Sequence, residues 1–530
     1  MTKFCLFIVG CFFLGCQKEV PKTIASYENI APKTLSKIRV TGNALPIDSL
    51  DLALFDSRIL TEFYKASGYK TVWQSDTNRK IIVEQLLQSE QEGLNPKDFH
   101  VDNLQELEQK HASLTGKELV HYDILLTHNF QKYLIQVNMG KLNPTNLYTD
   151  WDLKQPHFDV NAVLSEGFAT NSFNGILEKY HPKSVTYNSL IKALALINTY
   201  PVDRLKPIIV GQKLVLNDTN SSLIQIKKRL RYWNDLGGKD SLNRVYNKKT
   251  FEAVKRFQYR HGLISDGVIG PGTVVALNFT KTQRKEQIIA NLERWRWFNQ
   301  EFNENYILIN IPNYSLNVVE KQDTVVFRKV VVGTAKRRTP ILTSALKTVV
   351  FNPTWTVPPT ILKEDVVPAM MRNRNYLKNK SITIYDSNGK EVSPNQWNAS
   401  KPNNYKYIQS PGMGNSLGVM KILFPNNHSV YLHDTNHRNL FGMHNRSLSS
   451  GCVRVENPLE LAQQVLNDSE KWSKQRIDSV VATKKTNYVK INKNYAIYLW
   501  YWTAWSEKNK LYFRTDIYKL DSELYSKLRN

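Results

Sequence analysis

Cys452 is the residue of this sequence best suited to nucleophilic chemistry. It follows the run Ser449-Ser450-Gly451 and comes nineteen residues after His433. A thiol is mostly protonated near neutral pH, and a histidine can take its proton or stabilise the thiolate as an imidazolium. We therefore predict that Cys452 is a nucleophile and that His433 is its general base and acid.

The neighbours of this pair predict supporting roles. Asp434 is the nearest group that can fix the tautomer of the imidazole, through its backbone carbonyl. The flexible approach to the thiol predicts that the backbone N–H groups of Gly451 and Cys452 are free to hold an oxyanion. Arg454 would point to the same side of a strand as Cys452, where it would orient substrate or buttress the turn.

Plainer interpretations of this stretch remain open. His428, His437 and His444 lie close enough in the sequence to replace His433 as the base. A lone cysteine can be an inert core residue, and a Ser-Ser-Gly run can be an ordinary loop. Features in the rest of the chain help to decide between a catalytic and an inert Cys452.

The start of the chain has the pattern of an export signal. Lys3 precedes an apolar run that ends at Leu14 and is too short to cross a bilayer. The ending Leu14-Gly15-Cys16 resembles a bacterial lipobox, although Phe13 stands where leucine is usual. We predict a lipoprotein signal peptide over residues 1–16, lipidation of Cys16 and a polar tether over 17–50. An uncleaved anchor is the alternative.

Export would leave Cys452 as the only unmodified thiol of the mature chain. The four cysteines of the sequence are this residue and three near the start, at positions 5, 11 and 16. In a compartment where disulfides form, a free thiol without a partner favours a chemical role. The predicted location is the cell envelope, lipid-anchored and facing the periplasm.

Length and charge set broad limits. The chain has 530 residues, enough for about three or four domains. Its net charge of +24 favours anionic surroundings, which could be nucleic acid, a lipid surface or cell-wall polymer, and equally fits a generally basic protein. We find no nucleic-acid motif and predict no nucleic-acid partner. No His, Cys and carboxylate cluster has metal-ligand spacing, so no metal or other cofactor is predicted.

Periodicity divides the chain into helical and β-rich parts and predicts a multi-domain α+β fold. Apolar residues three or four apart predict an α-helical scaffold domain over 51–205. From about residue 300, β-branched and aromatic runs broken by turns predict a β-rich domain over 300–486. Within it, the β pattern is lost over residues 360–405, which we expect to form an insertion able to cover a cleft. The end of the chain, 487–530, predicts a β pair formed by about Tyr488–Trp500 and Lys510–Tyr518 that completes this domain.

Residues 222–278 resemble the peptidoglycan-binding domain of cell-wall enzymes. The resemblance lies in two helical stripes and in the ending FQYRHGLISDGVIGPGTVVALN, where Gly262, Gly267 and Gly270 permit tight turns between short helices. A small helical spacer that binds nothing is the alternative.

Residues 431–457 resemble the active-site signature of L,D-transpeptidases with a YkuD-type catalytic domain. His433, the Ser-x-Gly-Cys run that ends at Cys452, Val453 and Arg454 match the pattern, while Ser450 stands where many members have histidine. The segment Asn352–Pro359 and the tail from Trp500 resemble the large, multi-domain YcbB-like subgroup.

This resemblance implies functional roles. It implies that Cys452 accepts the acyl group, that His433 is the base and that Gly451 contributes its backbone to an oxyanion hole. Tyr431 and Trp355 align with positions that line the substrate pocket, to which Ser450 and Arg454 are also assigned. The insertion resembles the capping subdomain of the subgroup.

The function expected from the resemblance is peptidoglycan cross-linking. A tetrapeptide stem would donate its acyl group through a Cys452 thioester, a diaminopimelate amine would accept it in a 3→3 link, and carbapenems would inhibit. An L,D-carboxypeptidase and a non-catalytic wall-binding lipoprotein are the alternatives.

Overall fold

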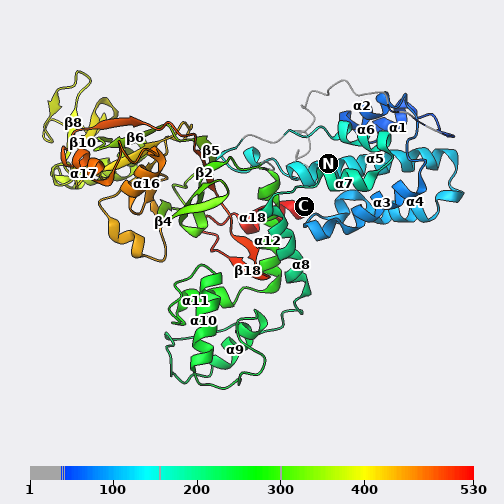
Figure 1. The fold of residues 1–530 in the computed structure, drawn as a ribbon, viewed down its shortest axis with the longest axis horizontal. Coiled ribbons are helices and arrows are strands. Elements are labelled where there is room, and N and C mark those ends of the chain that lie inside the picture. The colour runs from blue at the N-terminus through cyan, green and yellow to red at the C-terminus, as the bar shows by residue number, and fades with distance from the viewer. Residues whose placement is uncertain (1–37, 39, 41, 154–156, 299–300) are drawn as a thin grey trace, which may run out of the picture.

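The computed structural model describes residues 38, 40, 42–153, 157–298 and 301–530, and arranges them in three lobes (Figure 1). One lobe is helical and holds the N-terminal part of the chain, a smaller helical lobe holds residues of the middle, and the third is rich in strands. This arrangement agrees with the predicted multi-domain α+β class. The predicted signal peptide, Cys16 and most of the tether lie outside the described residues.

The N-terminal lobe is built from capped helices around one apolar core. Its helices α2 (Arg58–Ala66), α3 (Asp76–Leu87) and α5 (Gly116–Met139) each begin after a serine or threonine whose side chain accepts a backbone N–H. The other helices of this lobe are α1 (Ser49–Ala53), α4 (Val101–Gln109), α6 (Val160–Thr170) and α7 (Phe173–Tyr180). In the part of the chain that the structure describes, no helix has the length and apolar character needed to cross a membrane.

Two helices connect the lobes. α8 (Val185–Thr199) contributes Leu190, Leu194 and Ile197 to an apolar core that the middle and β-rich lobes share. It packs against α12 (Lys281–Arg296). α12 lies where the three lobes meet (Figure 1). It is buried on most of its surface, so it acts as a shared central element rather than as a linker.

The middle lobe contains three short helices, α9 (Leu223–Tyr232), α10 (Lys248–Arg260) and α11 (Pro271–Leu277). Gly262 and Gly267 have φ of +65° and +75°, which favours glycine. A Cβ atom at Gly267 would lie 2.2 Å from the ring of Phe251. Gly270 differs from the prediction: its φ is −97°, and it precedes α11 in an extended conformation.

A twelve-stranded sheet is the framework of the β-rich lobe. In spatial order its strands are β1 (Trp151–Asp152), β5 (Ile341–Ala345), β16 (Ala496–Trp500), β2 (Asn305–Asn310), β3 (Ser315–Glu320), β4 (Asp323–Gly333), β14 (Val453–Val455), β12 (Leu432–His433), β11 (Met420–Leu423), β6 (Thr348–Phe351) and β15 (Asn487–Lys490), with β13 (Ser447–Ser449) beside β4. Helices α16 (Pro458–Leu466) and α17 (Lys474–Ala482) belong to the same lobe.

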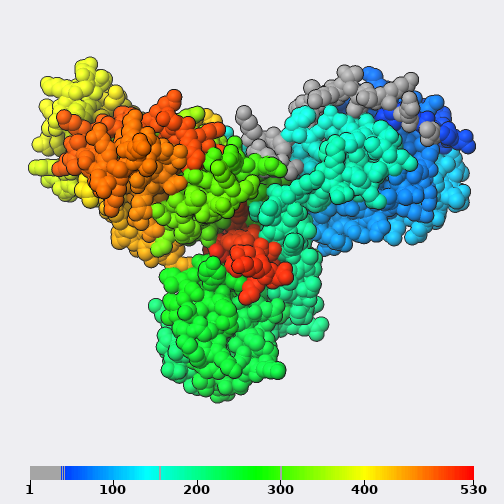
Figure 2. All heavy atoms as spheres, viewed as in Figure 1, coloured from blue at the N-terminus to red at the C-terminus, as the bar shows by residue number. Residues whose placement is uncertain are grey.

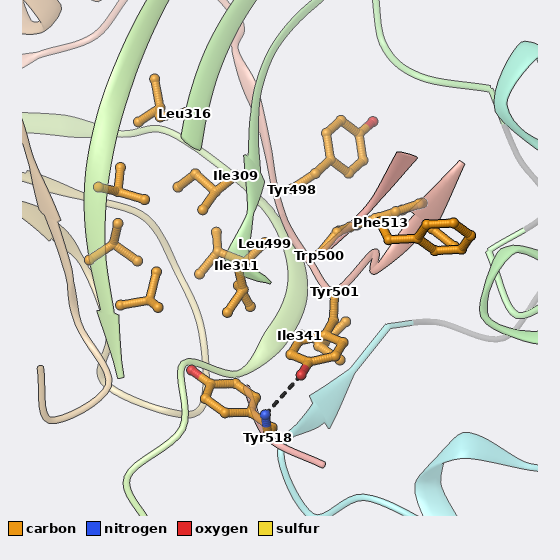
Figure 3. Close-up of a cluster of buried hydrophobic side chains, with 14 of the residues drawn as sticks. Ile309, Ile311, Leu316, Ile341, Tyr498, Leu499, Trp500, Tyr501, Phe513 and Tyr518 are labelled. Atoms are coloured by element: carbon orange, nitrogen blue, oxygen red, sulfur yellow. Dashed lines mark hydrogen bonds between the residues drawn. The ribbon is translucent and has the colours of Figure 1, made fainter. Parts of the chain in front are cut away.

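The tail of the chain packs into the core of this lobe. Figure 3 shows Ile309 and Leu316 of the first strands beside Leu499 and Trp500 of β16. The phenol oxygen of Tyr501 accepts a hydrogen bond of 2.8 Å from the backbone N–H of Tyr518 (Figure 3). Burial of such large side chains typically contributes about 1.5–3 kcal/mol each.

The C-terminal β pair differs from the prediction in its first strand. β16 pairs with β2 and β5 in the large sheet, and the hairpin is formed by β17 (Ala504–Glu507) and β18 (Lys510–Phe513). Lys508 and Asn509 have φ of +49° and +57°, as a two-residue hairpin turn requires. Helix α18 (Asp521–Arg529) follows.

The insertion forms a small subdomain, called the cap here and defined as residues 359–405. It carries β8 (Ile382–Tyr385) and β9 (Glu391–Val392), which join β7 (Trp355–Thr356) and β10 (Lys406–Gln409) in a separate four-stranded sheet. Helices α13 (Pro359–Ile361), α14 (Val367–Arg372) and α15 (Tyr376–Asn379) complete it, with a π-helical turn over Leu362–Val366. The cap lies at one end of the molecule (Figure 2). The expectation of a region without strands was wrong, because strands this short give no clear alternation.

Candidate active site

Strand pairing brings Cys452 and His433 to one face of the large sheet. β12 and β14 are parallel neighbours, with His433 opposite Arg454, and Cys452 immediately precedes β14. Because side chains alternate along a strand, Cys452, Arg454 and His433 project from the same face. Tyr431, two residues before His433, and Lys421, opposite His433 on β11, share this face.

His433 is held in one tautomer by a backbone carbonyl. Its side chain is buried, and Nδ1 lies 2.5 Å from the carbonyl oxygen of Asp434. A carbonyl can only accept, so Nδ1 carries the proton and Nε2 keeps a free lone pair. The carboxylate of Asp434 points elsewhere, where it accepts from the N–H of Val419 at 3.0 Å and from Arg438 at 2.8 Å.

The surroundings of His433 keep the imidazole neutral. Burial, together with the charges of Arg454 and Lys421, lowers the pKa of His433 to about 3, against the opposing effect of the Asp434 carbonyl. A neutral ring with a free Nε2 can accept a proton. It is therefore suited to act as a base rather than as a permanent cation.

The thiol of Cys452 is half-buried. Burial raises its pKa, while hydrogen bonding with Tyr431 and the charges of Arg454 and Lys421 oppose that rise. Sγ lies 4.0 Å from the carbonyl oxygen of Ser429. Within the described residues, no hydrogen bond joins this thiol to His433, which is common before substrate binds.

Two cations next to the thiol have no carboxylate partner. Among the salt bridges of the described residues, none involves Lys421 or Arg454, and burial lowers the pKa of both. Nε of Arg454 is buried without a hydrogen-bond partner. Sequence reasoning missed Lys421; the signal was a lysine between the buried residues Met420 and Ile422 of β11. The pair makes this face suited to an anion.

The turn that carries the thiol is closed by Ser449. Its Oγ donates to the carbonyl of Cys452 at 2.6 Å and accepts from the N–H of Gly451 at 3.2 Å. The N–H of Gly451 is therefore not free, contrary to the prediction. No hydrogen bond in the described part of the chain uses the N–H of Cys452, which stays available as an oxyanion donor. Gly451 has φ of +113°, a conformation that disfavours other residues.

A second layer supports this turn from the tail of the chain. Oγ1 of Thr339 donates to the carbonyl of Gly451 at 2.8 Å. The phenol of Tyr518 accepts from the N–H of Thr339 and donates to the carbonyl of Gly333, both at 3.0 Å. Contacts between residues so far apart in sequence leave no local pattern by which they could be found.

The remaining predicted residues lie around the thiol as well. Tyr431 lies beside the thiol, and Trp355 lies beside the phenol of Tyr431. The ring centroid of Tyr431 lies 5.7 Å from that of His433. Oγ of Ser450 accepts from Arg337 at 2.9 Å. Of the alternative bases, His428 lies 3.8 Å from Asp152, and none of the three has a contact with Cys452 among those of the described residues.

A cavity of about 380 Å³ lies beside the carboxylate of Asp434 and is lined by α16 and α17. Neither Cys452 nor His433 lines it. Because His433 and Asp434 are consecutive in the chain at the end of β12, their side chains point in opposite directions. The cavity therefore lies on the side of β12 away from the imidazole of His433. In the described residues, no group of three or more His, Cys, Asp and Glu side chains is placed to hold a metal ion.

The pKa directions predict the pH dependence of the thiol. Since the pKa of Cys452 is raised, its thiolate is scarce at neutral pH, and we expect its alkylation by iodoacetamide to keep rising as pH increases through 9. His433 stays neutral above about pH 4, so no inflection near 6.5 is expected. The measurement is the rate of Cys452 alkylation between pH 5 and 10, followed by mass spectrometry of the protein. A plateau reached below pH 8 would indicate a preformed thiolate–imidazolium pair instead.

Comparisons with known proteins match three parts of this chain. Residues 304–485 match the model of the L,D-transpeptidase catalytic domain, YkuD. Residues 58–194 match a scaffold domain, and residues 219–277 match the model described as "Putative peptidoglycan binding domain".

Individual proteins are similar over part of their length. A Haemophilus influenzae protein named "Putative L,D-transpeptidase" is 38% identical over 223 residues, which are 42% of this chain and 45% of that protein. The chain thus matches less than half the length of this relative. The L,D-transpeptidase structures from Xylanimonas cellulosilytica (14% identity, TM-score 0.17, 55% of this chain and 99% of that one) and Stackebrandtia nassauensis (12% identity, TM-score 0.22, 54% and 94%) were also found.

Proposed function

We propose that this chain, which carries a YkuD-type L,D-transpeptidase catalytic domain together with a scaffold and a peptidoglycan-binding domain, is a peptidoglycan L,D-transpeptidase that forms 3→3 cross-links. The observation that carries the proposal is the placement of Cys452 and His433 on one face of two parallel strands within the matched catalytic domain. Two unpaired cations beside the thiol support an anionic reaction centre.

In the first half-reaction, Sγ of Cys452 attacks the carbonyl carbon that links the L-centre of a diaminopimelate residue to the terminal D-Ala of a tetrapeptide stem. Nε2 of His433 takes the thiol proton and delivers it to the departing amine. The C–N bond breaks, D-Ala leaves, and a thioester joins the stem to Cys452. The neutral state of His433 is what this step requires.

In the second half-reaction, the amine of a diaminopimelate residue on another stem attacks the thioester. His433 now takes a proton from the attacking amine and returns it to the sulfur as the C–S bond breaks. The product is a 3→3 cross-link, and the thiol is regenerated. The same residues therefore serve both steps in reverse order.

The charges around the thiol support both steps. Lys421 and Arg454 stabilise negative charge that develops on sulfur and on the carbonyl oxygen of the tetrahedral intermediate, and each acts in a site partly shielded from water. The N–H of Cys452 is the backbone donor to the oxyanion, a contribution of about 2.7–4 kcal/mol per donor in comparable sites. Trp355, Tyr431 and Ser450 line the approach of the donor stem.

The pattern at the start of the sequence supports a place in the cell envelope. Lipidation of Cys16 would hold the protein at a membrane surface of the envelope, facing the periplasm, and the tether would let the folded part reach the wall. Residues 222–278 would keep the enzyme on peptidoglycan between reactions. Carbapenems, which present a strained carbonyl to a nucleophile, would acylate Cys452.

Purified protein incubated with disaccharide-tetrapeptides tests the proposal. We expect muropeptide dimers that carry a 3→3 link, together with free D-Ala, identified by liquid chromatography and tandem mass spectrometry. Trimmed monomers without dimers would mean hydrolysis and would reject the cross-linking function. Unchanged substrate, with no acyl-enzyme on Cys452, would leave only a wall-binding role.

A further inference from the structure

Arg337 stands between the cap and the turn that carries Cys452. It lies in the loop between β4 and β5, and its side chain is about one-fifth exposed. Nη2 and Nε lie 2.6 and 3.0 Å from Glu364, while Nη1 and Nη2 lie 2.6 and 3.0 Å from Asp365. Nη1 also donates to Oγ of Ser450 at 2.9 Å.

One guanidinium therefore links three parts of the domain. Glu364 and Asp365 belong to the π-helical turn of the cap, and Ser450 lies two residues before the nucleophile. A planar guanidinium carries five donors in a fixed geometry, so bonds to both carboxylates restrict where it can offer a donor to Ser450. A lysine at this position would present a single ammonium centre.

The ion pairs of Arg337 are also the salt bridges that join the cap to the rest of the domain. Among the described residues, every other salt bridge lies outside residues 359–405. The cap is also attached through strand β8, which pairs with β10, and through Leu362, Val366 and Met370, which pack in one apolar cluster with Val357 and Tyr407. The charged connection between the helical part of the cap and the turn of Cys452 thus passes through Arg337.

We propose that Arg337 is a positioning residue of the acyl transfer, which transmits the position of the cap to the Cys452 turn through Ser450. The inference rests on the proposed function. When Glu364 and Asp365 are in place, the guanidinium is held against Ser450 and the turn has one conformation. When the cap moves away to admit a stem peptide, Ser450 loses this constraint.

A double-mutant cycle separates coupling from simple access. One arm is the cap variant Glu364→Gln with Asp365→Asn, which removes the ion pairs but leaves Ser450. The other arm is Ser450→Ala, which removes the contact with the turn but leaves the ion pairs. The rate of Cys452 alkylation by iodoacetamide is measured in the wild type, each arm and their combination, since this readout needs no transpeptidase activity.

The proposal expects a non-additive cycle. The cap variant should change the alkylation rate by about two- to fivefold, the range for loss of exposed ion pairs, and this change should disappear in the Ser450→Ala background. An equal change in both backgrounds would mean that the cap only controls access, and no change in either would mean no coupling. Both results overturn the proposal.

Arg337 itself and a matched control complete the experiment. Arg337→Gln should raise hydrogen exchange in the cap helices and lower kcat/KM for tetrapeptide by about tenfold or more, because the nucleophile is less well positioned. Arg337→Lys should recover part of both effects.

Arg328→Gln is the control: Arg328 is similarly exposed and pairs with Glu460 in the same lobe, away from the cap. It should behave as the wild type; a matching loss would overturn the role of Arg337. If neither the wild type nor any variant turns over tetrapeptide, the proposed function is rejected. The alkylation rates still test the role of Arg337, because they do not depend on transpeptidase activity.

Discussion

Replacement of Cys452 with alanine is expected to abolish cross-linking, with a fall in rate on the order of 10⁴-fold or more. The reason is that the proposed pathway passes through a covalent thioester, and Cys452 is the only thiol in the part of the chain that the structure describes. The measurement is dimer formation from disaccharide-tetrapeptides together with the intact mass of the protein. The acyl adduct expected on the wild type, from substrate or a carbapenem, should be missing from the variant.

Cys452→Ser is the conservative companion. A serine hydroxyl keeps the size and polarity of the side chain but is a poor nucleophile without a strong base, so we expect loss of activity with normal thermal unfolding. Cross-linking at an undiminished rate in either variant would exclude the thioester pathway. If the Cys452→Ala protein unfolds at a markedly lower temperature than the wild type, the Cys452→Ser protein is used for the comparison instead.

Replacement of His433 with asparagine is expected to lower the rate of acylation by about 10²- to 10⁴-fold, the usual contribution of a general acid–base group. The amide nitrogen of asparagine can still donate to the carbonyl of Asp434, as Nδ1 does at 2.5 Å, so the local structure is kept while the base is removed. Pre-steady-state acylation by a carbapenem measures the step directly.

The other histidines of the stretch provide matched controls. His437→Gln and His444→Gln change residues without a described contact to Cys452, and we expect acylation rates close to the wild type. A large loss in one of these variants, with a small loss in His433→Asn, would transfer the role of base to that residue. Replacement of Asp434 with alanine should affect stability more than chemistry, because its carboxylate binds Val419 and Arg438.

The sequence allowed the framework and the neighbourhood of Cys452 and His433 to be predicted, but not the groups around these two residues. Alternating β-branched residues predicted the strands, and the family spacing predicted Cys452 with His433. The N–H of Gly451 could not be predicted, since its partner depends on the rotamer of Ser449. Arg337 could not be predicted either, because it meets Ser450 across 113 positions of the chain.

The elements misassigned from sequence were short or paired at long range. β8 and β9 have four and two residues, too few for a visible alternation. β16 has an apolar pattern that fits a hairpin as well as a central strand, and only its pairing with β2 and β5 decides between them.

The support that Tyr518 gives to the nucleophile turn bears on the order of folding. Gly333 and Thr339, which Tyr518 holds, precede it by well over a hundred residues, and β16 must insert between β5 and β2 before the tail can dock. A chain that emerges from a ribosome or a translocation channel with its N-terminus first can form the helical lobe early, yet it completes the surroundings of Cys452 only after residue 518 has emerged. The thiol of Cys452 thus gains its final setting at the end of biogenesis, after the helices of the middle lobe have emerged.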